Sequence, residues 1–282
     1  LASKCMVLKI CLGDKKNTIE IEKLKKEKLN KKIKFNLNKS QKKSLEELRK
    51  FGEKFNVSLL QGVTGSGKTI VYFERVKEVL SSGKQVLILL PEIFLTNQFK
   101  ERFVDFFGFS PSIWHSKIGI KSKRKIWQGV LSGNLNLVIG ARSSLLIPFK
   151  NLGLIVLDEE HDPSYKQDDG IIYHARDMAI ARASIENIPI HLVSAVPSLE
   201  TYNNVKTKKY NHSKLINRYS DFPLPEAKVI NLEKASLKSD QFIATETLEL
   251  INNYLKKKEQ VLFFLNRRGY SPFLICKVCG YK

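Results

Sequence analysis

From about residue 37 onward, short and mostly apolar runs alternate with longer segments of helical periodicity. The apolar runs predict buried strands at 57–60, 86–90, 135–139, 154–157 and 190–193. Apolar residues at helical spacing predict helices at 45–55 and 70–80. Strands without polar alternation that are separated by helices are typical of a parallel sheet covered on both faces. The pattern therefore predicts an α/β fold.

The pattern also predicts where this α/β domain ends. Residues 1–36 are dense in lysine, and we interpret them as a basic arm or the remnant of an upstream DNA-binding region. Residues 37–220 form the main domain, and the proline-containing stretch 221–225 interrupts it. We expect a linker and a helix at 221–258, and the start of a second α/β domain at 259–282, with a strand at 261–265.

Charge narrows the class of partner. The chain has 48 Lys+Arg and 28 Asp+Glu, a net charge of +20, which favours nucleic acid or an anionic membrane surface. The alternative is that many lysines simply lie on solvated faces. No run approaches the roughly 20 apolar residues that a membrane span requires. With 4 Cys in a chain of this length, we expect a reducing, cytoplasmic location.

One loop carries a specific chemical signature. Between a predicted strand and a predicted helix lies the P-loop pattern, with residues Gly62, Val63, Thr64, Gly65, Ser66, Gly67, Lys68 and Thr69. Glycines let backbone N–H groups turn around phosphate oxygens, and the following helix presents its positive dipole end. Lys68 is expected to reach the β- and γ-phosphates of ATP, and the Thr69 hydroxyl to bind Mg²⁺.

A second cluster decides between the many uses of such a loop. The predicted strand 154–157 runs into Asp158, Glu159, Glu160 and His161. Acids at the carboxyl end of a buried strand lie beside the phosphate loop in an open α/β sheet. We expect Asp158 to hold Mg²⁺ together with Thr69, Glu159 to activate the attacking water, and His161 to relay the nucleotide state. This run favours hydrolysis over the phosphoryl transfer of a kinase. A GTPase is disfavoured by the same run and because the sequence has no guanine-reading Asn-Lys-x-Asp stretch.

These two motifs together resemble superfamily 2 helicases, and further segments narrow the resemblance. The segments at 91–98, 140–144, 164–167, 173–177, 264–270 and 276–280 are similar to the PriA family of primosomal replication-restart helicases. The resemblance covers about 37–282. It implies a RecA-like P-loop helicase domain, and an ATP-dependent 3′→5′ DNA helicase for primosome assembly at stalled forks. Implied partners are forked or single-stranded DNA, primosome proteins and single-strand-binding proteins.

The resemblance also implies individual contacts. Gln41 resembles the adenine-reading glutamine of such helicases, although a surface glutamine is nearly as good an interpretation. The implied DNA contacts are Thr96, Arg142, Ser143, Tyr165, Lys166, Tyr173 and Arg176. Two alternatives stay open: Tyr173 as a core residue, and Arg176 with Asp177 as a pair at a helix start.

Cys276 and Cys279 have the spacing of half a zinc knuckle, with Gly280 completing the turn. Four ligands are normally required, and the resemblance implies that further cysteine pairs complete two zinc sites. We therefore expect a partial zinc-binding segment. A redox pair is the alternative.

Two departures from the family pattern change the expected activity. Val196 stands where the family's third motif has a threonine, so the coupling of hydrolysis to DNA movement is expected to be weaker. The sequence stops at Lys282, before the segment expected to supply an arginine finger. This polypeptide alone is therefore expected to bind ATP weakly and to hydrolyse it slowly or not at all. The alternative function is a non-enzymatic ATP- and DNA-binding module of a degraded helicase.

Overall fold

The structure, a computed structural model, describes residues 36–168, 170, 172–216, 226–231, 243–262 and 264. The chain divides into two compact units, Leu1–Phe222 and Pro223–Lys282. Each unit is described by itself below.

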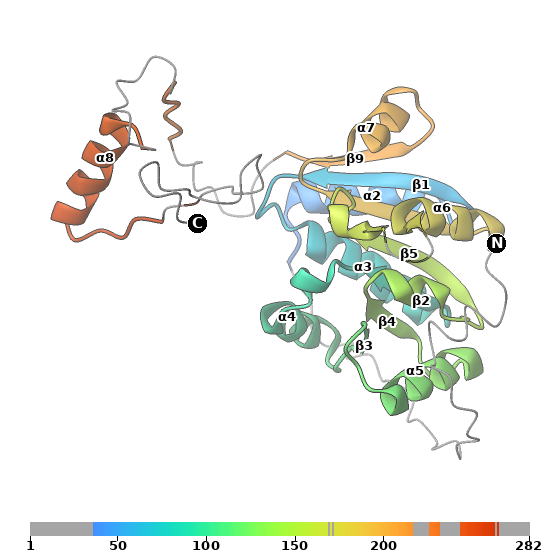
Figure 1. Ribbon diagram of the computed structural model, residues 1–282. Helices are drawn as coiled ribbons and strands as arrows, with labels where there is room; N and C mark the ends of the chain where they lie inside the picture. Colours follow the sequence, from blue (N-terminus) through green and yellow to red (C-terminus); the bar gives the residue numbers. More distant parts are fainter. Residues whose placement is uncertain are drawn as a thin grey trace. The chain divides into compact units, whose positions relative to one another are not determined.

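The first unit consists of strands separated by helices (Figure 1). Its strands are β1 (Asn56–Gly62), β2 (Gln85–Leu89), β3 (Ser112–Trp114), β4 (Leu137–Gly140), β5 (Leu152–Asp158), β6 (Lys166–Gln167), β7 (Tyr173–His174), β8 (Pro189–Ser194) and β9 (Asn211–Leu215). Its α-helices are α2 (Lys39–Lys50), α3 (Lys68–Ser81), α4 (Asn97–Phe107), α5 (Ile120–Ser132), α6 (Ala175–Ile185) and α7 (Leu199–Lys206). Its short 3₁₀ helices are η1 (Glu92–Phe94), η2 (Arg142–Leu146) and η3 (Pro163–Tyr165).

The main sheet has seven strands in the order β3-β4-β2-β5-β8-β1-β9, and every neighbouring pair is parallel. The predicted parallel α/β sheet is thus confirmed. Strand β8 pairs with β1 on one side and with β5 on the other. The carboxyl ends of β1, β8 and β5 therefore lie next to one another at one edge of the sheet, although they are far apart in sequence.

Apolar side chains cover both faces of this sheet, because successive residues of a strand point to opposite sides. On one face, Leu59 belongs to a buried cluster that includes Ala175, Ala179 and Ala183 of α6. On the other face, the next residue, Leu60, belongs to a cluster built with α2, α3 and α4. Burial on both faces explains why the strands read as apolar runs.

An aromatic cluster joins α3 to α4. The ring of Phe73 in α3 lies 5.6 Å from that of Phe103, 5.2 Å from Phe106 and 5.1 Å from Phe107 in α4. Phe103 and Phe107 are stacked at 4.4 Å. Each ring pair of this kind contributes roughly 0.5–1.5 kcal/mol beyond its buried area. The helix that follows β2 is therefore held against the helix that begins at the phosphate loop.

Helix α2 begins earlier than its apolar periodicity predicts, at Lys39 instead of 45, because of a cap. The Asn38 side chain accepts a hydrogen bond from the Gln41 backbone N–H at 2.8 Å, and the Asn38 N–H donates to Gln41 Oε1 at 3.0 Å. This reciprocal capping box satisfies two N–H groups that a helix start leaves free. The helix also ends earlier, before Gly52, whose φ is 93°.

The second unit is small in its described part. Helix α8 (Thr245–Lys256) agrees with the predicted helix, and none of its residues is buried. Val261, Leu262 and Phe264 form no strand, so the expected strand at 261–265 is not seen in its described residues. Cys276 and Cys279 lie outside the described residues. No helix in the described part of the chain is both long and apolar enough to cross a bilayer.

Candidate nucleotide-binding site

The loop between β1 and α3 has the backbone that a phosphate cradle needs. Gly65 and Gly67 have φ of 80° and 82°, in the left-handed region that glycine adopts most easily. A Cβ at Gly67 would lie 2.2 Å from Gln41 Nε2, and one at Gly62 would lie 2.5 Å from Ser66 Oγ. Glycine is therefore required at these positions for both conformation and space. Helix α3 begins directly afterwards with no side-chain cap on its N–H groups.

The Lys68 ammonium lies over this loop. It donates to the carbonyl oxygen of Gly62 at 2.7 Å and reaches that of Val63 at 3.5 Å. These two contacts hold the charged group at the mouth of the cradle, where phosphate oxygens compete with neutral carbonyls as acceptors. A contact between the ammonium and a phosphate pairs two opposite charges and is stronger than a contact with a neutral carbonyl, so we expect a phosphate to displace these carbonyls.

Asp158 is the last residue of β5 and is buried, with 7% of its surface exposed. Its Oδ2 accepts from the Tyr72 hydroxyl at 2.9 Å, and its Oδ1 accepts from the Glu159 N–H at 2.9 Å. Burial, and next the charge of Glu159, raise the pKa of the Asp158 carboxyl to about 6. The carboxyl is thus oriented by two donors in a place that favours an added cation.

Glu159 has a strained backbone. Its φ is 49°, which a residue with a side chain adopts at a cost, and its carbonyl accepts from the Asp162 N–H at 2.8 Å. The next contact leads to the neighbouring strand: His161 Nδ1 lies 2.8 Å from Ser194 Oγ at the end of β8, and 3.7 Å from Glu159 Oε2. His161 therefore connects the acidic turn to the segment that contains Val196.

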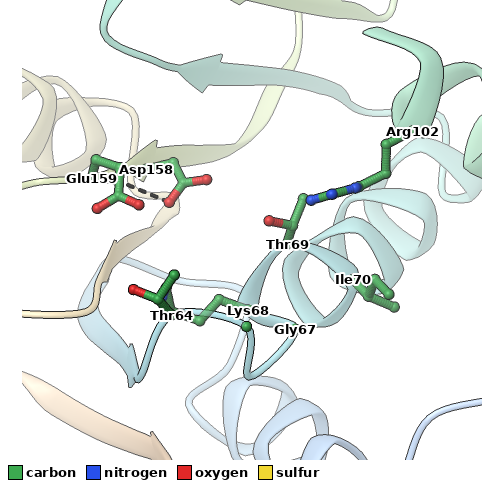
Figure 2. Close-up of a pocket in the computed structure, with 9 residues that line it drawn as sticks. Thr64, Gly67, Lys68, Thr69, Ile70, Arg102, Asp158 and Glu159 are labelled. Carbon is green, nitrogen blue, oxygen red and sulfur yellow. Dashed lines mark hydrogen bonds between the residues drawn. The ribbon is translucent and has the colours of Figure 1, made fainter. Parts of the chain in front are cut away.

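These groups surround one cavity of about 420 Å³ (Figure 2). It is lined by Thr64, Gly65, Gly67, Lys68, Thr69, Ile70, Arg102, Asp158 and Glu159. The cavity thus brings together most of the predicted loop residues and the two acids predicted to act with them. The predicted nucleotide-site residues that do not line the cavity are Gly62, Val63, Ser66, Gln41 and His161.

Gln41 lies behind the loop. Its side chain is fully buried and donates from Nε2 to the Ser66 carbonyl at 3.0 Å, while its Oε1 takes part in the cap of α2. A surface glutamine is thereby excluded. Contact with adenine stays a prediction.

The residues of the cavity fit a magnesium–nucleotide complex. The Ser66 hydroxyl, in the same loop, is buried without a partner in the described part of the chain, and the start of α3 has no side-chain cap. No group of three or more His, Cys, Asp or Glu side chains able to hold a metal occurs among the described residues. Mg²⁺ is commonly held by one or two protein ligands, substrate phosphates and water, which the Thr69 hydroxyl and the Asp158 carboxylate would satisfy.

Two of the predicted DNA contacts are wrong in this structure. Tyr165 is 1% exposed, and its hydroxyl donates to the carbonyl oxygens of Asp158 at 2.6 Å and Leu89 at 3.1 Å. Its ring belongs to the core and has no free face for stacking on a base. No local sequence pattern indicates this burial, because an aromatic residue in a polar loop suits either role.

Arg176 is the second correction. Its side chain is 9% exposed and pairs with Glu160 at 3.3 Å and with Asp177 at 3.1 Å. Glu160 is fully buried and also accepts from Ser198 N–H at 2.7 Å and Thr201 Oγ1 at 2.9 Å. We call these five residues the Glu160 cluster. Its carboxylates already neutralise the guanidinium, which leaves Arg176 unavailable to a DNA phosphate. The open alternative of a pair with Asp177 at a helix start is the one observed.

The other predicted DNA contacts lie at strand ends. Thr96 is exposed and caps α4, accepting from the Phe99 N–H at 3.2 Å. Ser143 accepts from Trp114 Nε1 at 3.1 Å, and Arg142 donates to the Lys166 carbonyl. Lys166 is exposed and pairs with Asp168 at 3.1 Å. Tyr173 is half-buried against the core beside α6. Whether they contact DNA stays a prediction.

Two residues of the site were missed by the sequence motifs. Tyr72 orients Asp158, and its place one turn after Lys68 on α3 was a usable signal because that face of the helix looks at the acids. Arg102 lines the cavity from α4, and nothing in its local sequence distinguishes it from the other charged residues of that helix.

The sheet order, the phosphate loop and the acids at the end of β5 define a nucleotide-binding domain of helicase type. A family model described as DEAD/DEAH box helicase matches residues 38–205. The chain belongs to the DEAD/DEAH box helicase family, whose members use ATP and Mg²⁺.

Within this family, the chain is similar to proteins named replication restart protein PriA. It is 51% identical over 225 residues to the one from Rickettsia conorii, covering 80% of this chain and 35% of that protein. It is 38% identical over 230 residues to the one from Bacillus subtilis, covering 81% of this chain and 29% of that protein. The chain thus spans about a third of the length of these relatives.

A solved structure supports the fold. The helicase MrfA aligns with a TM-score of 0.51 at 19% identity, over 83% of this chain and 36% of that chain. At this level of identity, the likeness concerns the fold alone.

Proposed function

We propose that this chain is the ATP-binding motor domain of a DNA helicase that acts in replication restart. The observation that carries the proposal is the single cavity shared by Lys68, Thr69, Asp158 and Glu159. The first two begin α3 after the loop that follows β1, the other two lie at the end of β5, and only β8 separates these strands in the sheet. Bound Mg²⁺ would neutralise phosphate charge, with Thr69 and Asp158 holding it. Lys68 would bind the β- and γ-phosphates, and Glu159 would orient a water molecule and accept its proton.

The site is also built to report on its nucleotide. His161 lies 3.7 Å from Glu159 and 2.8 Å from Ser194, so a change at the acid can reach the end of β8 through one side chain. This supports a role for His161 in coupling hydrolysis to movement. No step of hydrolysis itself requires it.

We further propose that DNA crosses the other half of the same sheet edge. Thr96 follows β2, Arg142 and Ser143 follow β4, and Lys166 follows β5. In the sheet these strands are neighbours, in the order β4-β2-β5. The groups therefore gather beside the nucleotide cavity, where they could contact backbone phosphates. Forked DNA, 3′→5′ polarity and primosome or single-strand-binding partners are the activity proposed from the similarity to PriA.

Nucleotide binding is tested with a fluorescent ATP analogue and Mg²⁺. We expect saturable binding by the wild-type chain and its loss in Lys68→Ala. Lys54→Ala is the matched control, because it removes an exposed lysine before β1, at the opposite edge of the sheet. Absence of saturable binding to the wild-type chain, or equal binding by Lys68→Ala, would overturn the proposal.

A second candidate is a module that binds ATP and DNA without unwinding. Val196 favours this second candidate. It lies two residues after Ser194, which contacts His161, and it is 71% exposed. Its side chain has no hydroxyl, whereas the family's third motif has a threonine there. The two functions differ in DNA-stimulated ATP turnover. Turnover that rises on adding forked DNA supports the motor, whereas nucleotide and DNA binding without turnover supports the module. A gain of stimulated turnover in Val196→Thr would assign the difference to this residue.

The proposal includes a zinc site at Cys276 and Cys279, supported by their spacing alone. Zinc content of the purified chain measured by mass spectrometry, compared with that of Cys276→Ser, tests it.

A further inference from the structure

Arg102 lines the nucleotide cavity although it belongs to neither the phosphate loop nor the acidic motif. It projects from α4, the helix that follows β2. Figure 2 shows its side chain extending toward Thr69, the residue expected to bind Mg²⁺. A guanidinium therefore faces the same space as Lys68, Asp158 and Glu159.

This guanidinium differs from other arginines of the fold. Arg49, Arg75, Arg176 and Arg182 each form an ion pair with a carboxylate. In the described residues, no hydrogen bond or ion pair engages the Arg102 side chain. Its five N–H donors are free to meet an acceptor that enters the cavity.

The backbone that carries Arg102 is held firmly. The adjacent Phe103 is fully buried, and its ring lies 5.6 Å from Phe73 of α3. Phe106, one turn further along α4, packs against the same ring at 5.2 Å. Since α3 begins at Lys68, the aromatic cluster fixes the origin of the Arg102 side chain relative to the phosphate loop. Only the exposed side chain has to adjust when a ligand binds.

The charges of the cavity call for such a cation. Without Arg102, its lining carries one cation, Lys68, and two carboxylates, Asp158 and Glu159. A magnesium–ATP complex adds further negative charge, and phosphate in a partly enclosed site needs compensating cations or N–H donors. Arginine is the side chain best suited to two phosphate oxygens at once.

We propose that Arg102 is a phosphate-binding residue, supplied within the chain by α4, that contacts the triphosphate of the bound nucleotide. This inference rests on the proposed nucleotide site and adds a residue to it. The contact is available in this domain by itself, so it contributes to nucleotide affinity before any other domain or partner engages.

The test measures affinity for fluorescent ATP and ADP analogues with Mg²⁺, together with thermal unfolding of the ligand-free chain. Arg102→Ala should weaken ATP binding by about tenfold to a hundredfold, the range for a hydrogen bond to a charged group. The ATP affinity of Arg102→Lys should lie between that of the wild type and that of Arg102→Ala, because lysine keeps the charge and lacks the planar guanidinium. Lys100→Ala is the matched control, since it removes a cation from the same helix outside the cavity lining.

The unfolding temperature without ligand should stay unchanged in Arg102→Ala, since the side chain is exposed. Equal losses for ATP and ADP would assign the contact to the α- or β-phosphate, and a greater loss for ATP would assign it to the γ-phosphate. The inference would be overturned if Arg102→Ala bound ATP as tightly as the wild type while Lys68→Ala did not bind it. The proposed function would then stay intact. Failure of the wild-type chain to bind nucleotide would instead overturn the proposed function.

Discussion

Asp158 combines burial with a carboxyl group that the site needs in its charged form. Its pKa of about 6 in the folded chain lies above the ordinary value of 3.8, because burial and Glu159 both disfavour the charge. Well below pH 3.8 the carboxyl is protonated in both the folded and the unfolded chain. As the pH rises through 6, the folded chain must ionise a buried group, so this residue's contribution to stability is lost.

The corresponding prediction compares the wild-type chain with Asp158→Asn in the presence of EDTA. The variant keeps the shape and has no charge to ionise. From pH 5 to pH 7.5 the wild-type free energy of unfolding should fall by about 1–1.5 kcal/mol relative to that of the variant. Urea unfolding at the two pH values measures the difference. If the difference in unfolding free energy between the two proteins were the same at both pH values, the pKa of Asp158 would not be raised. Without EDTA, excess Mg²⁺ at pH 7.5 should stabilise the wild type relative to the variant by binding the carboxylate.

At this scale, the sequence motifs correctly placed residues around one cavity and did not predict which side chains are exposed. Lys68, Thr69, Asp158 and Glu159 were recognisable because their roles demand particular residue types at particular strand ends. Tyr165 failed as a DNA contact because its burial depends on how η3 folds back over β2 and β5, which no local pattern records.

The Glu160 cluster acts at the scale of elements. Glu160 follows β5, Arg176 lies in the first turn of α6, and Ser198 and Thr201 lie at the start of α7. Four hydrogen-bonding contacts converge on the one buried carboxylate, from the Ser198 N–H, the Ser198 hydroxyl, the Thr201 hydroxyl and the Arg176 guanidinium. The cluster thus ties the acidic turn to two helices that are distant in sequence.

Removing one member of this cluster should be costly. Glu160→Ala leaves the Arg176 guanidinium buried without its main partner, and we expect a loss of about 3–5 kcal/mol in the free energy of unfolding. Glu160→Gln should lose less, because the amide oxygen still accepts hydrogen bonds. Urea unfolding followed by circular dichroism measures both.

Glu200→Ala is the control for this prediction. Its carboxylate lies 3.7 Å from the same guanidinium, but its side chain is 70% exposed, so little change is expected. If Glu160→Ala proved no more destabilising than Glu200→Ala, the cluster would not be the structural link described.

Strands were predicted well where they are buried inside the sheet, and less well where they are the outermost strands of the sheet. The five predicted strands correspond to β1, β2, β4, β5 and β8, which are mostly buried. The edge strands β3 and β9 were not predicted, because one has only three residues and the other reads Asn-His-Ser-Lys-Leu, half polar. Their strand structure comes from pairing with β4 and β1.

For the whole molecule, the excess of positive charge predicts a salt-dependent affinity for DNA. Arg142→Ala and Lys166→Ala should each weaken binding to single-stranded DNA and lower the slope of log affinity against log salt by about 0.7 to 1. Fluorescence anisotropy with a labelled oligonucleotide at several salt concentrations measures this. Lys54→Ala should leave both quantities unchanged, since it lies at the other edge of the sheet. If all three variants weakened binding equally, DNA would be attracted by the overall charge and would not follow the proposed path.

The strand order has a consequence for the time at which this site can exist. Strand β8 is made after both β1 and β5, yet it lies between them. Until residue 194 has been synthesised and β8 has inserted, the phosphate loop and Asp158 cannot take up their places. Such long-range pairing is slow, since a large loop must close before any contact stabilises it. A nascent chain that ends before β8 therefore holds every nucleotide-binding residue and has no assembled nucleotide site.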